Sequence, residues 1–468
     1  MKFRWEEDLL GRMKIPADAL WGIHTARATE NFKLSGRKVH PFLIRAFGAV
    51  KWACAQTNFE LGCLQEAHYR ALEDACREML NGELDDFILT DALQGGAGTS
   101  LNMNVNEVLC NRALQLLGKS PGSYEVLHPI EQVNLHQSTN DTFPTALRVA
   151  ALWLLDELED NLVALLETLQ TLEHTFADVV RIARTELQDA VLTTMGGTFG
   201  AFAEPIARDR WRVYKSKERL RVVNLGGTAI GTGITAPRRY IFRVVENLKN
   251  ITRLALARAE NLIDATQNAD PIVEADGILQ TCAVNLFKIS NDLRWLASGP
   301  ESGLREIVLP PRQAGSSIMP GKVNPVIPEA VIQAALTVMS NHERLSKAAA
   351  LGNFELNAFL PLMADALLTN LDLLKNAVRL LDRCCLRGIR VNREVCRQNV
   401  LNSTATLTAL VSRIGYARAQ ALAGAMQESG KSLKTLVLGQ NLLSESEFEQ
   451  LISAESVTRL GEKESAHD

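Results

Sequence analysis

Hydrophobic positions recur at helical spacing over long stretches of the chain. Three stretches carry apolar residues that repeat mainly at three- and four-residue intervals, which places them on one face of a helix. The first comprises Leu155, Leu158, Leu162, Leu165, Leu169, Leu172 and Phe176; the others comprise Leu286, Ile289, Leu293 and Leu296, and Leu360, Leu367, Leu371, Leu374, Val378 and Leu381. Because strand signals are few, the pattern predicts a bundle of long helices. We expect Pro144 and Pro205 to mark helix boundaries.

Length, composition and charge limit the number of domains and the kinds of partner that the protein can have. A chain of 468 residues is long enough for two or three domains. Hydrophobic residues make up 46% and charged residues 22%, which is typical of globular proteins. The net charge of -4, with no basic stripe, argues against a nucleic acid partner. The 8 cysteines are dispersed and lack zinc-site spacing, and no apolar run has the length of a signal peptide or membrane span. We therefore expect a cytoplasmic protein with no membrane partner.

The most distinctive segment is rich in Gly, Ser and Pro and spans residues 313–329. Gly315 permits a positive φ angle, so that the N–H groups of Ser316 and Ser317 can converge on an anion. Lys322 adds a positive charge and Asn324 an amide, both suited to holding a carboxylate. An ordinary structural loop is the alternative, but apolar residues alternate with these polar ones, which favours a mobile loop that binds an anion.

A helix is expected directly after this loop. Pro328 suits a first helical turn, and Glu329 follows it at the start of an apolar run.

A second candidate segment, residues 94–107, has three glycines ahead of a predicted helix. Backbone N–H groups at a helix start attract anions, and the hydroxyl of Thr99 lies at this point. The segment is equally compatible with a simple Gly-rich helix entry.

A third segment offers consecutive polar donors at Ser138, Thr139 and Asn140, followed by Asp141, which can cap the next helix. Capping alone would explain these residues equally well.

These motifs resemble those of the aspartase/fumarase superfamily. Residues 315–325 resemble its signature loop, and residues 137–145 resemble a second conserved region. Residues 95–100 and 224–233 resemble further regions in their aspartase-like form. The resemblance implies a mainly α, three-domain fold with a central long-helix bundle. The expected domains are a mostly helical N-terminal domain (1–137), the bundle with the signature loop (138–393) and a small helical C-terminal domain (394–468).

The resemblance also implies a reaction: reversible, cofactor-independent deamination of L-aspartate to fumarate and ammonia through an enediolate intermediate. Its catalytic base would be Ser316, supported by Glu329, and no metal site is expected. The residues implied to bind substrate are Thr99, Ser138, Thr139, Asn140, Thr185, Glu186, Ser317, Lys322 and Asn324. The chain would form a homotetramer, with each active site built from loops of three subunits.

The chain departs from the family at Glu186, where His or Gln is usual. Glu186 could stay protonated, through burial or a proton shared with Glu329, or pair with the ammonium group of an amino-acid substrate. We favour pairing with the ammonium group. The alternative that the Glu186 side chain points away from the site is about equally compatible with the sequence. His128 and Pro129 match an accessory anion motif of fumarases, but Ile130 and Glu131 do not, so that site is not assigned.

Three alternative functions remain open. Fumarate hydratase is one, although the family's His is missing where Glu186 stands. A lyase acting on another substituted succinate is the second. The third is a non-catalytic helical scaffold, which the intact Ser316, Lys322 and Asn324 disfavour.

Overall fold

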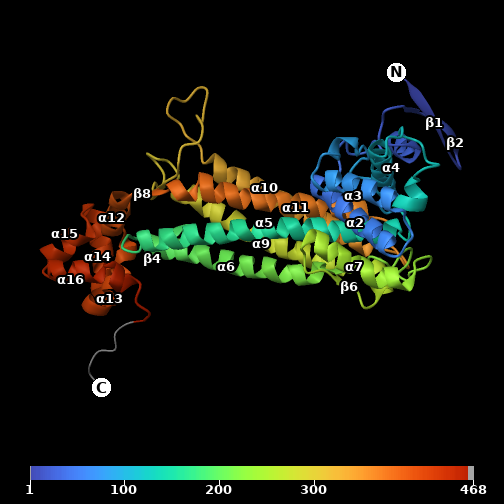
Figure 1. Ribbon diagram of the computed structural model, residues 1–468. Coiled ribbons are helices and arrows are strands. Elements are labelled where there is room, and N and C mark those ends of the chain that lie inside the picture. The colour runs from blue at the N-terminus through green and yellow to red at the C-terminus, as the bar shows by residue number, and fades with distance from the viewer. Residues whose placement is uncertain (1, 462–468) are drawn as a thin grey trace. The chain divides into compact units, whose positions relative to one another are not determined.

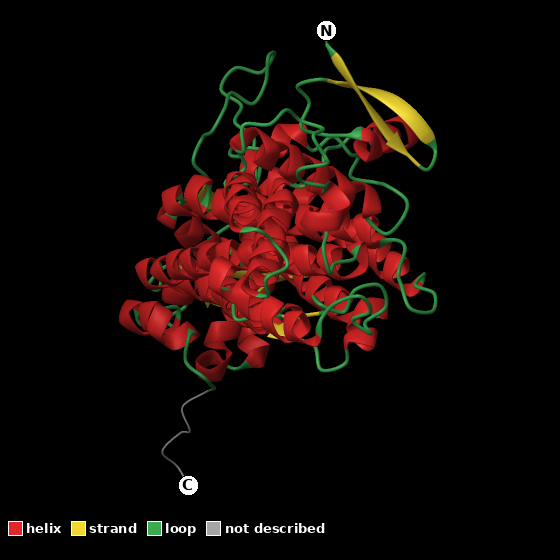
Figure 2. Cartoon of the chain, turned by 45° about the vertical axis from the view of Figure 1, so that its right-hand side comes forward, coloured by secondary structure: helices red, strands yellow, loops and turns green. Residues whose placement is uncertain are grey.

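The computed structural model describes residues 2–461 and consists mainly of helices, as Figures 1 and 2 show. The helices of the first half are α1 (Ile23–Asn31), α2 (Pro41–Glu60), α3 (Glu66–Leu80), α4 (Thr99–Leu116), α5 (Thr139–Thr175), α6 (Met195–Leu220) and α7 (Arg238–Thr252). Those that follow are α8 (Leu262–Gln267), α9 (Asp270–Leu296), α10 (Val326–Ala350), α11 (Leu360–Cys384), α12 (Arg393–Asn402), α13 (Leu407–Ile414), α14 (Tyr416–Ser429), α15 (Leu433–Gly439), α16 (Glu445–Leu451) and α17 (Ala454–Val457).

Strands form only small two-stranded sheets in the described chain. The antiparallel pairs are β1 (Phe3–Asp8) with β2 (Gly11–Pro16), β3 (Val180–Thr185) with β4 (Gln188–Thr194), and β7 (Ile307–Val308) with β8 (Arg390–Val391). The parallel pair is β5 (Val222–Val223) with β6 (Ala257–Arg258). The mainly α class is thus confirmed.

The predicted apolar seams are buried in the long helices, except that Leu172 and Phe176, at the end of the first seam, are half-buried. Leu158, Leu162, Leu165 and Leu169 of α5 are fully buried, as are Leu286 and Leu293 of α9 and Leu371, Leu374, Val378 and Leu381 of α11. Burial of each apolar side chain stabilises the bundle by about 1.5–3 kcal/mol relative to exposure. No helix in the described part of the chain is both long enough and apolar enough to cross a membrane.

Two compact units divide the chain. One comprises residues 1–159, 211–283 and 335–375, and the other comprises residues 160–210, 284–334 and 376–468. Residues of α5, α6, α9, α10 and α11 are divided between them. The three domains expected from the sequence, 1–137, 138–393 and 394–468, stay a prediction, and residues 462–468 lie outside the described residues.

The first unit contains helices α2, α3, α4 and α7, which pack against one another. The rings of Phe47 on α2 and Phe143 on α5 meet edge to face, with centroids 5.9 Å apart. A buried carboxylate, Asp276 of α9, accepts hydrogen bonds from Asn370 of α11 and contacts His342 of α10, each at 2.8 Å. The ring contact joins α2 to α5, which begins with candidate residues, and Asp276 joins α9, α10 and α11.

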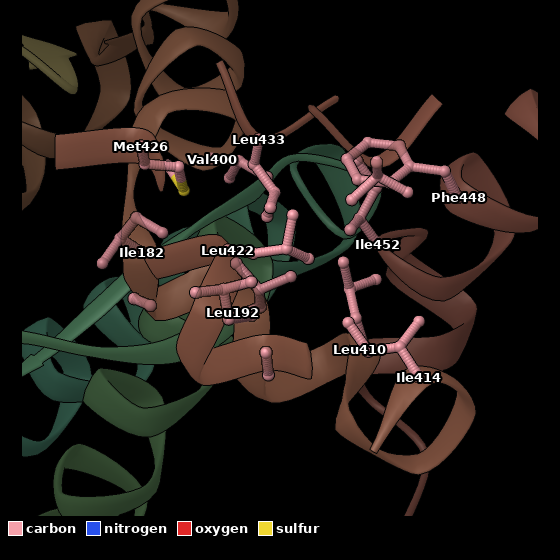
Figure 3. Close-up of a cluster of buried hydrophobic side chains, with 14 residues drawn as sticks. Ile182, Leu192, Val400, Leu410, Ile414, Leu422, Met426, Leu433, Phe448 and Ile452 are labelled. Carbon is pink, nitrogen blue, oxygen red and sulfur yellow. The ribbon is translucent and has the colours of Figure 1, made fainter. Parts of the chain in front are cut away.

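The second unit has a separate apolar core, shown in Figure 3. Ile182 of β3 and Leu192 of β4 pack with side chains of the small C-terminal helices, among them Leu422, Leu433 and Phe448. The β3–β4 hairpin is therefore anchored on these helices.

The expected helix boundaries at two prolines are wrong. Pro144 lies inside α5 and Pro205 lies inside α6. A proline removes the hydrogen bond to the carbonyl four residues earlier. For Pro144 that carbonyl belongs to Asn140, and it accepts a hydrogen bond from the Asn224 side chain at 2.9 Å instead.

Candidate active site

The signature loop lies between α9 and α10 and extends away from the helices (Figure 1). Two hydrogen bonds close it at its base. The N–H of Gly315 donates to the carbonyl oxygen of Lys322 at 2.8 Å, and the side-chain amide of Asn324 donates to the carbonyl oxygen of Gly315 at 2.9 Å. A Cβ atom at Gly315 would lie only 2.5 Å from the Lys322 oxygen. Close approach of two backbone segments, and not a positive φ angle, therefore requires glycine here.

The hydroxyl of Ser316 receives two backbone hydrogen bonds. Its Oγ accepts from the N–H of Ile318 at 3.1 Å and from the N–H of Met319 at 3.0 Å. That the N–H groups of Ser316 and Ser317 converge on an anion stays a prediction; the donors to the Ser316 hydroxyl come from the two residues after Ser317. Donors fixed in this way stabilise negative charge that develops on the serine oxygen.

The other polar residues of the loop differ in their environments. Ser317 and Lys322 are exposed, whereas the amide nitrogen of Asn324 is engaged inside the loop. Glu329 lies in the first turn of α10, where its N–H donates to the carbonyl of Pro325 at 3.2 Å. The helix expected after the loop is confirmed.

Thr185 and Glu186 lie at the exposed tip of the β3–β4 hairpin. Thr185 pairs with Gln188, and the two residues between them, Glu186 and Leu187, have φ angles of 53° and 63°. Two left-handed residues in a two-residue loop define a type I′ turn, which normally uses Asn and Gly. A non-glycine residue in this conformation is strained, and such strain is concentrated at functional sites.

A buried ion-pair cluster supports the hairpin along strand β3. The carboxylate of Glu306 is fully buried and binds Arg181 at 2.6 Å and Arg184 at 2.7 Å. Both arginines lie on β3. Together with the apolar core of Figure 3, this cluster fixes the strands that present Thr185 and Glu186.

Thr99 begins α4, as the sequence predicts for a helix entry. Ala97 and Gly98 precede it with φ angles of 56° and 96°, and the Thr99 hydroxyl donates to the carbonyl of Gly96 at 2.8 Å. A Cβ atom on Gly98 would overlap the ring of Phe143. Glycine thus lets the start of α4 lie directly against the first turns of α5.

The Ser138 segment is joined to the loop of residues 224–233 by Asp141. This fully buried carboxylate accepts from the N–H groups of Ser138 at 2.9 Å, Gly226 at 3.1 Å and Thr228 at 3.0 Å. Burial raises the pKa of Asp141 to about 6, although these hydrogen bonds lower it. The predicted N-cap position of Asp141 is wrong: Asp141 is the third residue of α5, and the Ser138 hydroxyl accepts from the N–H of Asn140 at 3.2 Å at the helix start. In addition, Asn140 donates to the carbonyl of Ala229 at 2.7 Å.

Asparagine side chains connect this segment to α4. Asn102 donates to the Thr139 hydroxyl at 3.1 Å and to the Asn134 side chain at 3.3 Å. Asn134 also accepts from Asn106 at 3.2 Å and from the buried ammonium group of Lys51 at 3.1 Å. Sequence patterns did not identify Asn134 or Lys51. The signal for Lys51 is a single lysine within the otherwise apolar run 46–55.

The candidate residues fall into two groups. Thr99, Ser138, Thr139 and Asn140 are brought together in the first unit, and Thr185, Glu186, Ser316, Ser317, Lys322, Asn324 and Glu329 belong to the second. That the groups act on one substrate stays a prediction. Within residues 2–461, no cluster of three or more His, Cys, Asp or Glu side chains is arranged to hold a metal ion.

Two family profiles match the chain. The profile described as Lyase matches residues 11–340, and the one described as Fumarase C C-terminus matches residues 407–459.

Individual proteins of known sequence or structure are similar to this chain over nearly its whole length. An aspartate ammonia-lyase from Bacillus sp is 41% identical over 458 residues, which cover 98% of each chain. Among solved structures, the fumarate lyase:delta crystallin from Brucella melitensis is 43% identical with a TM-score of 0.92, covering 96% of this chain and 98% of that one. A class II fumarase from Schistosoma mansoni is 32% identical with a TM-score of 0.91; the match covers 98% of this chain and 99% of the fumarase.

Proposed function

Because the chain belongs to the aspartase/fumarase family of lyases, we propose that it deaminates L-aspartate reversibly to fumarate and ammonia. The observation that carries this proposal is the pair of N–H groups that donate to Oγ of Ser316. The aspartase-like form of the other motifs, and the similarity to an aspartate ammonia-lyase, favour ammonia over water as the leaving group.

Ser316 would act as the base. A serine hydroxyl is weakly acidic, so its alkoxide must be stabilised before it can remove a proton from carbon. The N–H groups of Ile318 and Met319 point at the oxygen where that charge resides, and the closed loop holds them in place. The charge of Lys322, on the same loop, would add to this stabilisation.

The proton would leave the carbon next to the β-carboxylate of aspartate. Its electron pair then enters that carboxylate and forms an enediolate, which carries two negative charges on its oxygens. The loop donors would bind this end, and the donors at Thr99 and Ser138–Asn140 would bind the other carboxylate. Collapse of the enediolate forms the carbon–carbon double bond of fumarate and expels ammonia.

Glu186 would bind the substrate's ammonium group. Its side chain is exposed on the turn between β3 and β4, so it is available to a cation without prior disruption of an ion pair within the described chain. An ionised carboxylate here attracts an ammonium group and repels an additional anion.

A direct assay tests the proposal. Fumarate release from L-aspartate is followed by absorbance, with L-malate in parallel and with the Ser316→Ala protein as control. We expect turnover of aspartate alone and its loss in the variant. Turnover of malate would identify a hydratase, and inactivity on both substrates would direct the search to other substituted succinates.

A homotetramer with shared active sites completes the proposal. It is supported by the exposure of Thr185, Glu186 and Lys322 in the single chain. Light scattering coupled to size-exclusion chromatography should give four times the protomer mass of 51.5 kDa. Reassembled mixtures of Ser316→Ala and Glu186→Ala subunits should regain activity if these residues come from different chains, and should stay inactive if they come from one.

A further inference from the structure

A buried lysine lies behind the proposed carboxylate-binding segment. Lys51, on α2, is only 1% exposed. Its ammonium group donates to the side-chain oxygen of Asn134 at 3.1 Å and to that of Gln137 at 2.8 Å. Both acceptors are neutral amides, and none of the ion pairs found within residues 2–461 includes Lys51. A buried ammonium group without a carboxylate in direct contact is costly to folding, which indicates a role beyond stability.

The two acceptors of Lys51 lie directly before the Ser138–Asn140 donors. The Asn134 oxygen accepts from Lys51, Asn102 and Asn106 together, and Asn102 also donates to the Thr139 hydroxyl. Gln137, the other acceptor, is the residue adjacent to Ser138. Lys51 thus supports the segment through two separate contacts.

Charge adds to this positioning effect. Burial lowers the pKa of Lys51 to about 8, so the side chain is mostly protonated at neutral pH. The charged and titratable groups that face it are Cys54, Cys76 and Asp141. A positive charge in a low-dielectric interior favours an anion bound at the neighbouring surface.

We propose that Lys51 is a positioning residue for the reaction: it holds Asn134 and Gln137 and thereby orients the Ser138–Asn140 donors toward a substrate carboxylate. The inference rests on the proposed function, which supplies that carboxylate. Lys51 itself does not touch the substrate.

The test uses the full-length protein in four variants: Lys51→Met, Gln137→Met, the double variant, and Lys217→Met as a matched control. Lys217 is a partly buried lysine of α6 that binds Glu159 at 2.7 Å, away from the candidate residues. The values of kcat and KM for L-aspartate are measured together with the Kd of fumarate by calorimetry, and melting temperatures establish folding.

We expect each single variant to lower kcat/KM between about 10- and 100-fold, because a small displacement of binding groups has effects of this size. Fumarate binding should weaken, more so in Lys51→Met because the charge is lost as well. The double variant should be no worse than Lys51→Met, since that change already removes the Lys51–Gln137 contact. Lys217→Met should match the wild type.

A folded Lys51→Met protein with wild-type kcat/KM and fumarate Kd would overturn the inference, as would fully additive losses in the double variant. If Lys51→Met does not fold, unchanged kinetics and binding in folded Gln137→Met overturn it instead. A wild-type protein that binds fumarate without converting aspartate would refute only the proposed function. In that case the Kd of fumarate, compared between wild type and variants, tests the role of Lys51. Absence of both turnover and binding in the wild type would overturn both.

Discussion

The side-chain amide of Asn324 donates a hydrogen bond to the carbonyl oxygen of Gly315 at 2.9 Å, which joins the two ends of the signature loop. Beside it, the N–H of Gly315 donates to the carbonyl of Lys322. These two contacts decide where the Ser316 hydroxyl and its two N–H donors lie.

Gly315→Ala should therefore abolish the closed loop. Its Cβ atom would lie 2.5 Å from the Lys322 oxygen, so the two backbone segments must separate. We expect kcat to fall by about 100-fold or more, as for loss of donors that stabilise an oxyanion. Because the loop is largely exposed, the melting temperature should change little. Gly424→Ala, in α14 with open space around it, serves as the control and should keep full activity. Wild-type kcat in Gly315→Ala would contradict a need for loop closure.

Glu186→Gln tests the proposed contact with the ammonium group. The change keeps the shape of the side chain and removes its charge. Since only aspartate carries an ammonium group, KM for aspartate should rise about 10-fold, whereas fumarate binding should stay equal or strengthen. Steady-state kinetics and fumarate calorimetry measure the two effects. Glu428→Gln, at an exposed position of α14, controls for general loss of surface charge. Equal weakening of aspartate and fumarate would indicate that Glu186 acts in some other way.

Glu306→Ala should destabilise the second unit. The substitution leaves Arg181 and Arg184, which bind the buried carboxylate, without their partner. Breaking such a buried pair costs about 3–5 kcal/mol of unfolding free energy. Urea unfolding, followed by circular dichroism at fixed protein concentration, measures the loss. The exposed pair between Glu445 and Lys434 provides a control, and Glu445→Ala should change stability little. Equal effects of the two substitutions would refute a structural role for the Glu306 cluster.

Lys51 should make the unfolding free energy depend on pH in the alkaline range. Its pKa is about 8 in the folded protein, below the ordinary value of 10.5. Between these values the unfolded chain binds more protons at this site, so the unfolding free energy rises as pH increases. From the size of the pKa shift, the rise is about 3 kcal/mol. The difference in unfolding free energy between wild type and Lys51→Met, measured at pH 7 and pH 10, isolates this contribution. A difference that does not vary with pH would contradict it.

The sequence by itself determined the helical class and the chemistry-bearing segments. Positions such as Leu158 and Leu165 are buried where their spacing predicted, because helical periodicity is a local property of the chain. The loop before α10 and the helix entry at Thr99 were predictable for the same reason, since Gly and Pro act on neighbouring backbone angles.

Tertiary structure decided the features that depend on distant residues. Pro144 lies within a helix because Asn224 satisfies the carbonyl that it leaves free. The turn at Glu186 uses no glycine because strands fixed by Glu306 and the C-terminal core impose it. No local pattern reveals such partners.

The same distinction holds within the candidate site. The sequence identified Ser316 but not the donors that converge on its oxygen, because their direction depends on how the loop closes between Gly315 and Lys322. It identified the Ser138 segment but not Lys51, which lies more than eighty residues earlier and meets Gln137 only when α2 packs in the first unit. Residue types and local spacing specified the available chemistry, whereas long-range packing specified which groups meet.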